Sequence, residues 1–480
     1  QNRIIRADLN KPIIVQGAAG SGKTTIALHR ISYFIYTYAE QFRPEQLMIL
    51  APNNLFIDYI SDVLPELGVD RILQTTLIDY VKGCIGKKVQ LVPPSEKLNK
   101  FIDGSLNNAE MVQWISSFKG SLELKGIIDR YLEDVLQSIV PRGDFYLSKF
   151  KLYSGERVEK LIVEQYNYLP YYRRLEKVGE VLKNIVRTEK KILLQKVDKF
   201  YEDKIEEALF KLKLDPAKPK SYVTKAMDKK DELMEEIQKE SRTVVRAYLK
   251  QVVKHDLYHY FDELFTNRSV LKKYASDILD DYQINFFCDY QRKLRSKRKF
   301  EVEDLASLLY LQHHLFGVPK ELRARNIVID EAQDYSYFQL YALKSALDTD
   351  MFTIVGDLAQ GIHSYRGIND WHLVKEEIFP RATYTTLQKS YRTTVEIMQV
   401  ANEVLALLPL DLPKVEPVVR HGARPVFYEC ADEAEAVELV VAEISRLYDD
   451  GMKTIAIIGK TEKESVKLEK LMRKYGNGVY

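Results

Sequence analysis

Residues 12–31 read PIIVQGAAGSGKTTIALHRI, and this stretch decides the fold. An apolar run comes first, a loop with glycines at positions 17, 20 and 22 follows, and a helical pattern of apolar residues ends the stretch. That order predicts a buried strand, a phosphate-binding loop and the start of a helix. Glycines let backbone amides approach phosphate oxygens, and the positive end of the helix points at them. The spacing predicts a nucleoside-triphosphate site in an α/β fold, and a plain glycine turn is a poor alternative.

The side chains of this loop have separate expected roles. Lys23 can reach the β- and γ-phosphates, and Thr24 offers a hydroxyl to Mg²⁺. A triphosphate and Mg²⁺ are therefore the expected ligands. The other residues of the loop that we expect to contact the nucleotide are Gly17, Ala18, Ala19, Gly20, Ser21, Gly22 and Thr25.

Length and composition limit what surrounds the loop. The chain has 480 residues, of which 46% are hydrophobic and 29% charged, and roughly 150 residues per domain suggests about three units. No apolar run approaches the ~18 residues of a membrane span, and no signal peptide is visible. Cys84, Cys288 and Cys430 lie too far apart for a zinc pattern or a disulfide framework. We expect a cytoplasmic protein without a membrane partner, and its oligomeric state does not follow from the sequence.

Two further strand-loop motifs carry acidic and amide side chains. Residues 325–334, RNIVIDEAQD, form a β-branched run that ends in acids, and residues 352–367 read FTIVGDLAQGIHSYRG. The carboxyl ends of parallel strands are where an α/β sheet places its ligands. Asp330 would hold Mg²⁺, Glu331 would orient or deprotonate the attacking water, and Gln360 would sense the γ-phosphate. A surface acidic turn is the alternative for the first motif alone.

A fourth motif, TLQKSYRTT at 386–394, precedes a helical pattern. Taken alone, Tyr391 and Arg392 are more simply a packed ring and a surface charge. The order and spacing of the four motifs favours a functional interpretation of both.

These four stretches resemble motifs I to IV of the superfamily 1A helicases, the family of UvrD, PcrA and Rep. The resemblance implies a RecA-like ATPase that uses ATP and Mg²⁺. It further implies that Gln1 reads adenine, that Tyr391 stacks on the base, and that Arg392 contacts the γ-phosphate from a second RecA-like domain. Residues 15–30 are more similar to the HelD proteins, helicase-like ATPases that bind bacterial RNA polymerase, which implies that polymerase as partner.

The stretches that contact DNA in UvrD-type enzymes differ here. The Thr- and Lys-containing motif of those enzymes is replaced by LAPNNLF at residues 50–56. Their Thr-Phe-His element is replaced by Thr-Thr-Leu at residues 75–77, which retains only the threonine, Thr75. Loss of aromatic stacking, worth about 1–3 kcal/mol per base, weakens the case for a single-strand track. Tyr365 stands where PcrA has a tryptophan and could still stack. DNA contact at Thr75 and Tyr365 therefore remains a candidate.

Motifs V and VI of this family do not occur before Tyr480. We therefore expect a fragment of a longer protein. Because motif VI brings a second arginine to the γ-phosphate, we expect the isolated chain to bind ATP and to hydrolyse it poorly.

The segment 84–295 consists of long runs with apolar residues at helical spacing, broken at 215–220. It predicts a mostly helical insertion with paired long helices forming an arm. Residues 151–300 contain 34 Lys and Arg against 25 Asp and Glu. Basic residues among aromatics can bind nucleic acid, although a solvated helix face is an equally good interpretation. The candidates from the densest basic run are Arg295, Lys297 and Arg298.

The expected architecture is an α/β P-loop protein. Residues 1–83 and 296–383 would form a RecA-like domain, 84–295 its insertion, and 384–480 part of a second RecA-like domain. The expected function is an ATPase similar to HelD that remodels or recycles RNA polymerase. One alternative is a single-stranded DNA translocase or helicase that uses the insertion as its 1B subdomain, and another is a nucleotide-gated interaction module. The residues expected to be catalytic are Lys23, Asp330, Glu331, Gln360 and Arg392.

Overall fold

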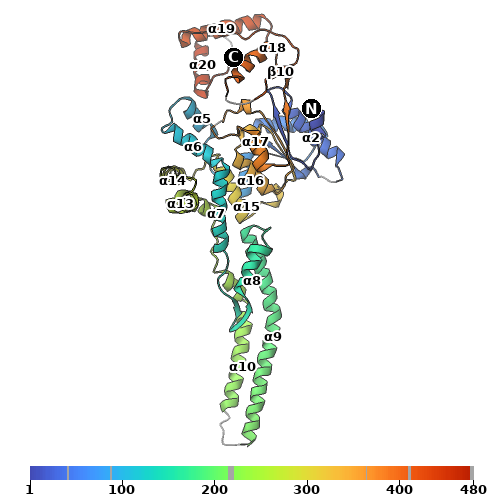
Figure 1. Cartoon of the computed structure of the whole chain (residues 1–480), viewed down its shortest axis with the longest axis vertical. Helices are drawn as coiled ribbons and strands as arrows, with labels where there is room; N and C mark the ends of the chain where they lie inside the picture. The colour runs from blue at the N-terminus through green and yellow to red at the C-terminus, as the bar shows by residue number, and fades with distance from the viewer. Residues whose placement is uncertain (41–42, 87–88, 215–220, 364, 409–411, 476–480) are drawn as a thin grey trace.

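The computed structural model describes the chain except for residues 41–42, 87–88, 215–220, 364, 409–411 and 476–480. It contains a parallel sheet domain, a large helical insertion and a smaller C-terminal part (Figure 1). The C-terminal part and the paired helices α9 (Tyr171–Leu214) and α10 (Ser221–Glu240) lie toward opposite ends of the molecule.

The sheet has six parallel strands in the order β3-β2-β6-β7-β1-β8. Strands 1, 2, 6 and 7 are fully buried, as the apolar and β-branched runs predict. The predicted α/β P-loop fold is therefore confirmed. The bounds of the strands are β1 Ile13–Gly17, β2 Leu47–Ala51, β3 Leu73–Thr76, β6 Asn326–Ile329, β7 Phe352–Gly356 and β8 Thr383–Leu387.

Helices cover both faces of this sheet. On one face, Ile13 and Val15 of β1 pack with α2 (Lys23–Thr37) and α3 (Asn54–Glu66). On the other face, Ile14 belongs to a larger core. This alternation follows from the two-residue period of a strand. The larger core contains α4 (Leu77–Ile85), α15 (Asp304–Leu315) and α16 (Tyr337–Leu347), together with much of the insertion.

The insertion consists of two parts, which we call the body and the arm. The body packs in the same core as the sheet domain, so most of the insertion is not a separate arm, contrary to the simplest expectation. Its elements are α5 Pro94–Ile102, α6 Ala109–Lys119, α7 Leu122–Ser138, the antiparallel pair β4 Phe145–Leu147 and β5 Phe150–Tyr153, α8 Gly155–Lys160, α11 Val244–Leu249, α12 Leu257–Thr266, α13 Arg268–Ala275 and α14 Asp281–Ser296.

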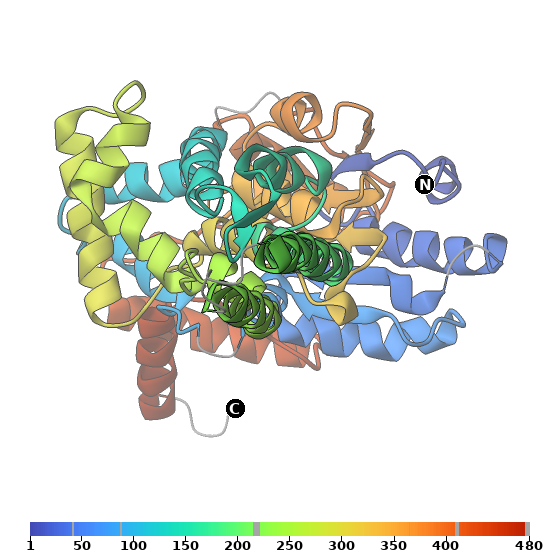
Figure 2. The same ribbon diagram turned by 90° about the horizontal axis from the view of Figure 1, so that it is seen from below.

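The arm is the pair of long helices α9 (Tyr171–Leu214) and α10 (Ser221–Glu240). At about 1.5 Å per residue, the 44 residues of α9 span roughly 66 Å. Leu193 of α9 and Ile237 of α10 share a small core with Leu147 of the hairpin. The two helices project from the sheet domain and are seen end-on from below (Figure 2). Paired long helices were predicted here, and the predicted break at 215–220 lies outside the described residues.

Two of the predicted boundaries cut through elements. Helix α4 continues past position 83, and β8 continues past 383 as the edge strand of the first sheet, where Thr385 pairs with Val15. The boundary at 384 is therefore wrong, because the first sheet includes residues up to Leu387. The first two residues of the motif at 386–394 are the end of β8. The sequence pattern does not reveal this strand, because it is defined by its pairing with β1.

The C-terminal part contains three longer helices, α18 (Val395–Leu405), α19 (Glu433–Asp449) and α20 (Glu462–Tyr475). A short parallel pair joins β9 (Lys389–Ser390) to β10 (Glu416–Pro417). In the described part of the chain, residues 424–430 and 452–459 pair with no strand. That residues 384–480 begin a second RecA-like domain stays a prediction. The remaining short elements are α1 Asn2–Ile5, α17 Trp371–Leu373 and the turns Pro44–Gln46, Leu161–Gln165, Lys320–Leu322, Ala332–Asp334, Leu358–Gln360 and Val374–Ile378.

Candidate nucleotide-binding site

The loop after β1 is closely packed and depends on its glycines. Gly20 and Gly22 adopt positive φ angles of 73° and 83°, a conformation that side-chain-bearing residues rarely take. A Cβ atom at Gly20 would lie 2.4 Å from Cβ of Arg392. The second of these glycines caps α2, which begins at Lys23. The loop thus presents backbone amides at a helix N-terminus, the arrangement that suits a phosphate.

Lys23 lies inside this loop, with 8% of its surface exposed. Its Nζ donates to the carbonyl oxygens of Gly17 at 2.8 Å and Ala18 at 3.4 Å. The same Nζ lies 3.8 Å from Oδ2 of Asp357 at the end of β7. The ammonium group is therefore fixed over the loop, where phosphate oxygens would meet it.

The two predicted magnesium ligands are in direct contact. The Thr24 hydroxyl donates to Oδ2 of Asp330 at 2.6 Å. Burial raises the pKa of Asp330, while the Thr24 hydrogen bond opposes this shift. Oxygen ligands of this kind, completed by phosphate and water, suit Mg²⁺. Among the residues that the structure describes, no cluster of three or more His, Cys, Asp and Glu offers a separate metal site.

Glu331 is held by a relay of amides. It has a positive φ of 50°, and its carboxylate accepts a hydrogen bond from Nε2 of Gln333 at 2.8 Å. The other end of that amide accepts from the backbone N–H of Asp357 at 2.8 Å. Glu331, the predicted general base after β6, is thereby connected through Gln333 to the end of β7.

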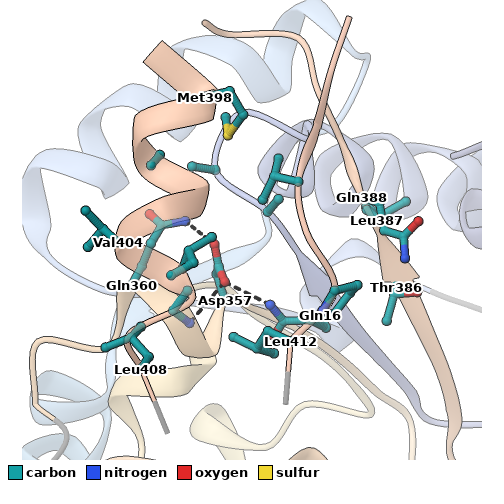
Figure 3. A pocket seen from close by; sticks show the side chains of 17 residues that line it. Gln16, Asp357, Gln360, Thr386, Leu387, Gln388, Met398, Val404, Leu408 and Leu412 are labelled. Carbon is teal, nitrogen blue, oxygen red and sulfur yellow. Dashed lines mark hydrogen bonds between the residues drawn. The ribbon is translucent and has the colours of Figure 1, made fainter. Parts of the chain in front are cut away.

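Gln360 lies beside the same carboxylate of Asp357, to which its Nε2 donates (Figure 3). Gln16 Nε2 donates to the other oxygen of Asp357 at 2.8 Å. Because Asp357 also faces Lys23, any displacement of the lysine by phosphate would act on Gln360. A cavity of about 440 Å³ separates these side chains from Met398 and other apolar residues of α18.

The opposite wall meets the loop through residues 390–392. The backbone N–H of Tyr391 donates to the carbonyl of Gly20 at 2.9 Å, and Arg392 is exposed beside it. Ser21 Oγ and Ser390 Oγ are buried at this contact, and neither has a hydrogen-bond partner within the described ranges. Buried hydroxyls without a partner cost free energy, so a ligand rich in acceptor oxygens fits this place.

A cavity of about 570 Å³ opens next to this contact. Gln1 lines it, donating Nε2 to the carbonyl of Ser21 at 2.9 Å, and Tyr391 lines its other side with 56% of its surface exposed. His29 and Thr25 of α2 complete the wall. The two residues that the resemblance assigned to the base thus share one cavity beside the phosphate loop.

Three residues that hold the site together were not predicted as site residues. They are Gln16, Gln333 and Asp357. Asp357 could have been found, because it follows β7 as Asp330 follows β6. The two glutamines reach Asp357 through contacts more than twenty residues away in sequence, which no local pattern reveals.

Three of the five predicted nucleic-acid residues are not exposed. Thr75 is half-buried in β3, and Tyr365 is 8% exposed with its ring 5.0 Å from that of Phe101. Arg295 pairs with Asp262 at 2.6 Å and so is already engaged. Stacking by Tyr365 on a base would require its contact with Phe101 to open. Of the basic run, Lys297 and Arg298 are exposed.

A cavity of about 480 Å³ lies behind Glu331, between β3 and the loop after β7. Asp334 and His363 line it, and each has a buried atom without a partner in the described structure. Burial lowers the pKa of His363 to about 4, and burial together with Glu331 raises that of Asp334 to about 6. At neutral pH the imidazole is therefore uncharged.

The fold and this site define a P-loop protein of the RecA-like class. The profile of the UvrD/REP helicase N-terminal domain matches residues 125–376, more than half of the chain, and the chain belongs to this family. No helix in the described ranges is long and apolar enough to cross a membrane.

Curated relatives include the ATP-dependent DNA helicase PcrA of several bacteria. The protein of Bacillus subtilis is 26% identical over 223 residues, which are 44% of this chain and 30% of that protein. The proteins of Staphylococcus epidermidis and Staphylococcus aureus are 29% and 28% identical over 215 residues, 42% of this chain and 29% of theirs. The chain thus spans less than a third of the length of these relatives.

Proposed function

We propose that this chain binds and hydrolyses ATP and uses the nucleotide state to move its helical insertion against a macromolecular partner. One observation carries the proposal: a buried chain of ion pairs connects the nucleotide side of the sheet to the body. A loop that responds to the nucleotide can therefore displace the insertion, on which the arm stands.

The ion chain begins on the loop after β7, which also carries Gln360. Arg366 of this loop lies 3.8 Å from Glu303, which pairs with Lys97 of α5 at 3.0 Å. Lys97 also pairs with Glu301 at 2.7 Å, and Glu301 pairs with Lys119 of α6 at 2.8 Å. The side chains of all five residues are at most 10% exposed. We call these residues, with Asp304, the ion network.

Burial makes the ion network sensitive to displacement. Charges in a low-dielectric interior interact strongly, and an ion left without its partner there is costly. A shift of the loop that carries Arg366 must therefore be followed by Glu303 and its lysines. Those lysines belong to the body, so the displacement is passed to the insertion.

The residues around the nucleotide have distinct proposed roles. Bound ATP and Mg²⁺ supply the reactive phosphoanhydride and neutralise charge on its oxygens. Lys23 and the loop amides orient the β- and γ-phosphates, and Glu331 receives a proton from the attacking water. Arg392 contacts the γ-phosphate from the opposite wall. Closure of the cleft is favoured because the ligand has contacts with both walls only when they meet.

RNA polymerase is the proposed partner, on the basis of the resemblance of residues 15–30 to HelD. Two features support a protein partner over a DNA track. Tyr365 is packed against Phe101 rather than presented to a base, and the insertion carries a projecting two-helix arm. Beyond Val186, which packs in the larger core, α9 continues to Leu214 for roughly 42 Å at about 1.5 Å per residue, as a lever acting on a large assembly requires.

A single-stranded DNA translocase is the second candidate. The PcrA relatives favour it, since their name is that of DNA helicases. The exposed Lys297 and Arg298 directly follow α14, the last helix of the insertion, where a translocase would place a backbone contact. A nucleotide-gated interaction module is the third, and it differs from both in needing no rapid hydrolysis.

The test measures phosphate release by the chain alone, with single-stranded oligonucleotide, and with purified bacterial RNA polymerase. We expect stimulation by polymerase, with co-elution of the two on gel filtration, and indifference to DNA. Stimulation by DNA alone, abolished by the double substitution of Lys297 and Arg298 with glutamate, would overturn the polymerase proposal in favour of the translocase. A matched substitution of the exposed Lys320 and Arg381 with glutamate controls for net charge.

A further inference from the structure

The segment ahead of β1 contributes one wall of the base cavity. Gln1, Asn2 and Ile5 line this cavity. The short helix α1 (Asn2–Ile5) lies against α2, which contributes the neighbouring wall. A four-residue helix has little stability of its own, because forming the first turn is unfavourable. Its position must be fixed by contacts with the sheet domain.

Arg30 of α2 provides these contacts. Its Nη1 donates to the carbonyl oxygens of Ile4 at 2.7 Å, Ala7 at 2.9 Å and Ile5 at 3.3 Å. Its Nη2 donates to the carbonyl of Asp8 at 3.2 Å. The residue is 1% exposed. One guanidinium thus accounts for backbone carbonyls at four positions of the segment between Gln1 and β1.

The other end of the guanidinium is anchored in the sheet. Nε donates to Oγ1 of Thr353 in β7 at 3.0 Å, and the guanidinium carbon lies 4.3 Å above the ring centre of Phe34. Burial lowers the pKa of Arg30 to about 10, and Asp8 opposes that shift, so the group is charged at neutral pH. Arg30 is therefore a cross-link between the sheet and the segment that carries Gln1.

The helix that carries Arg30 also lines the cavity. Thr25, Ile26 and His29 of α2 line it, together with the capping residue Gly22. Because Arg30 is on the same helix, its bonds fix the segment against the very wall that these residues form. Gln1 itself donates to the carbonyl of Ser21, and the bonds from Arg30 hold the rest of the segment against α2.

We propose that Arg30 is a positioning residue that sets the base selectivity of the nucleotide site, by holding Gln1 where it can hydrogen-bond to adenine. This inference rests on the proposed use of ATP. Arg30 does not touch the nucleotide, and it acts only through the segment 1–8. Adenine has an amino donor at position 6 and an acceptor at N1, whereas guanine has an oxygen acceptor at position 6 and a donor at N1. A Gln1 amide held in one orientation therefore discriminates between the two bases, and a mobile amide does not.

Arg174 of α9 supplies a matched control. It is also buried, and its guanidinium donates to the carbonyl oxygens of Leu169, Ile162 and Asn167 at 2.8 to 3.0 Å. It lies in the insertion rather than at the base cavity. Loss of either arginine should cost stability, but only loss of Arg30 should change base selectivity.

The experiment compares Arg30→Met, Arg30→Lys and Arg174→Met in the whole chain. Equilibrium binding of fluorescent ATP and GTP analogues gives the ratio of the two dissociation constants. We expect the preference of the unaltered chain for ATP to fall about tenfold in Arg30→Met, the worth of one hydrogen bond. Arg30→Lys should restore part of it. Hydrogen exchange at residues 1–8 should accelerate in Arg30→Met and remain unchanged in Arg174→Met.

The outcomes separate this inference from the proposed function. An unaltered preference for ATP in Arg30→Met, or an equal loss in Arg174→Met, would overturn the role of Arg30 and leave ATP binding intact. An unaltered chain that binds neither nucleotide would overturn the proposed function and, with it, this inference. If Arg30→Met does not fold, Arg30→Lys and Thr353→Val decide, because each removes only some of the bonds.

Discussion

Replacement of Glu331 with glutamine is expected to lower the rate of ATP hydrolysis by roughly 10²- to 10⁴-fold, the usual contribution of a general base. Binding of ATP should be unchanged, because the phosphates are held by Lys23 and the loop. The substitution retains an acceptor for Gln333 and a side chain of the same shape at a position with positive φ. Phosphate release under single-turnover conditions is the measurement.

The control for this substitution is Glu321→Gln, an exposed acid-to-amide change on the same domain. Equal hydrolysis by Glu331→Gln and the unaltered chain would remove Glu331 from the reaction. The same variant also separates a motor from a slow switch. Polymerase stimulation should disappear with a motor, whereas a nucleotide-gated module should retain its partner binding.

The ion network should be the most sensitive part of the core. Lys119 is 1% exposed and pairs with Glu301 at 2.8 Å and Asp304 at 2.9 Å. Replacing it with methionine leaves Asp304 buried without its cation and Glu301 with Lys97 alone, which costs about 3–5 kcal/mol. Urea unfolding should show this loss. The control is Lys100→Met, whose exposed pair with Glu96 is worth at most about 1 kcal/mol.

The pH dependence of this loss has a definite sign. Burial alone would raise the pKa of Glu301, but Lys119 and Lys97 outweigh it and lower the value to about 2, from 4.5. The stabilisation from its charge is therefore present above pH 4.5 and is lost as the pH falls toward 2. The difference in free energy of unfolding between Lys119→Met and the unaltered chain should therefore become smaller as the pH falls from 4.5 toward 2. A gap that is constant from pH 7 to pH 3 would contradict a charged network.

Much of the nucleotide site could be predicted because each of its motifs is local. A strand followed by a glycine loop or by acids specifies Lys23, Asp330 and Gln360 within a few residues of a buried run. Parallel strands then bring their carboxyl ends to one edge, and Thr24 meets Asp330 there across three hundred residues. The contact between Thr24 and Asp330 therefore follows from two local motifs and the geometry of a parallel sheet.

The remaining features depend on contacts that a local pattern does not contain. The edge strand β8 is defined by its pairing with β1, and the ring of Tyr365 is covered by Phe101 of α5, more than 250 residues earlier in the chain. Arg295 was part of a basic run in the sequence, but its partner Asp262 lies on a neighbouring helix. The division of the insertion into body and arm depends on which helical faces find the sheet, since both parts have the same periodicity.

The central claim is that nucleotide in the cleft moves the insertion, and a spin-label distance tests it most directly. Labels at Asp58→Cys of α3 and Glu202→Cys of α9, in a chain with Cys430→Ser and Glu331→Gln, report the position of the arm. Saturating ATP with Mg²⁺ is predicted to shift the distance distribution, and adding Lys23→Met or Lys119→Met should abolish the shift. An identical distribution with and without ATP, in a chain shown to bind it, would contradict the account.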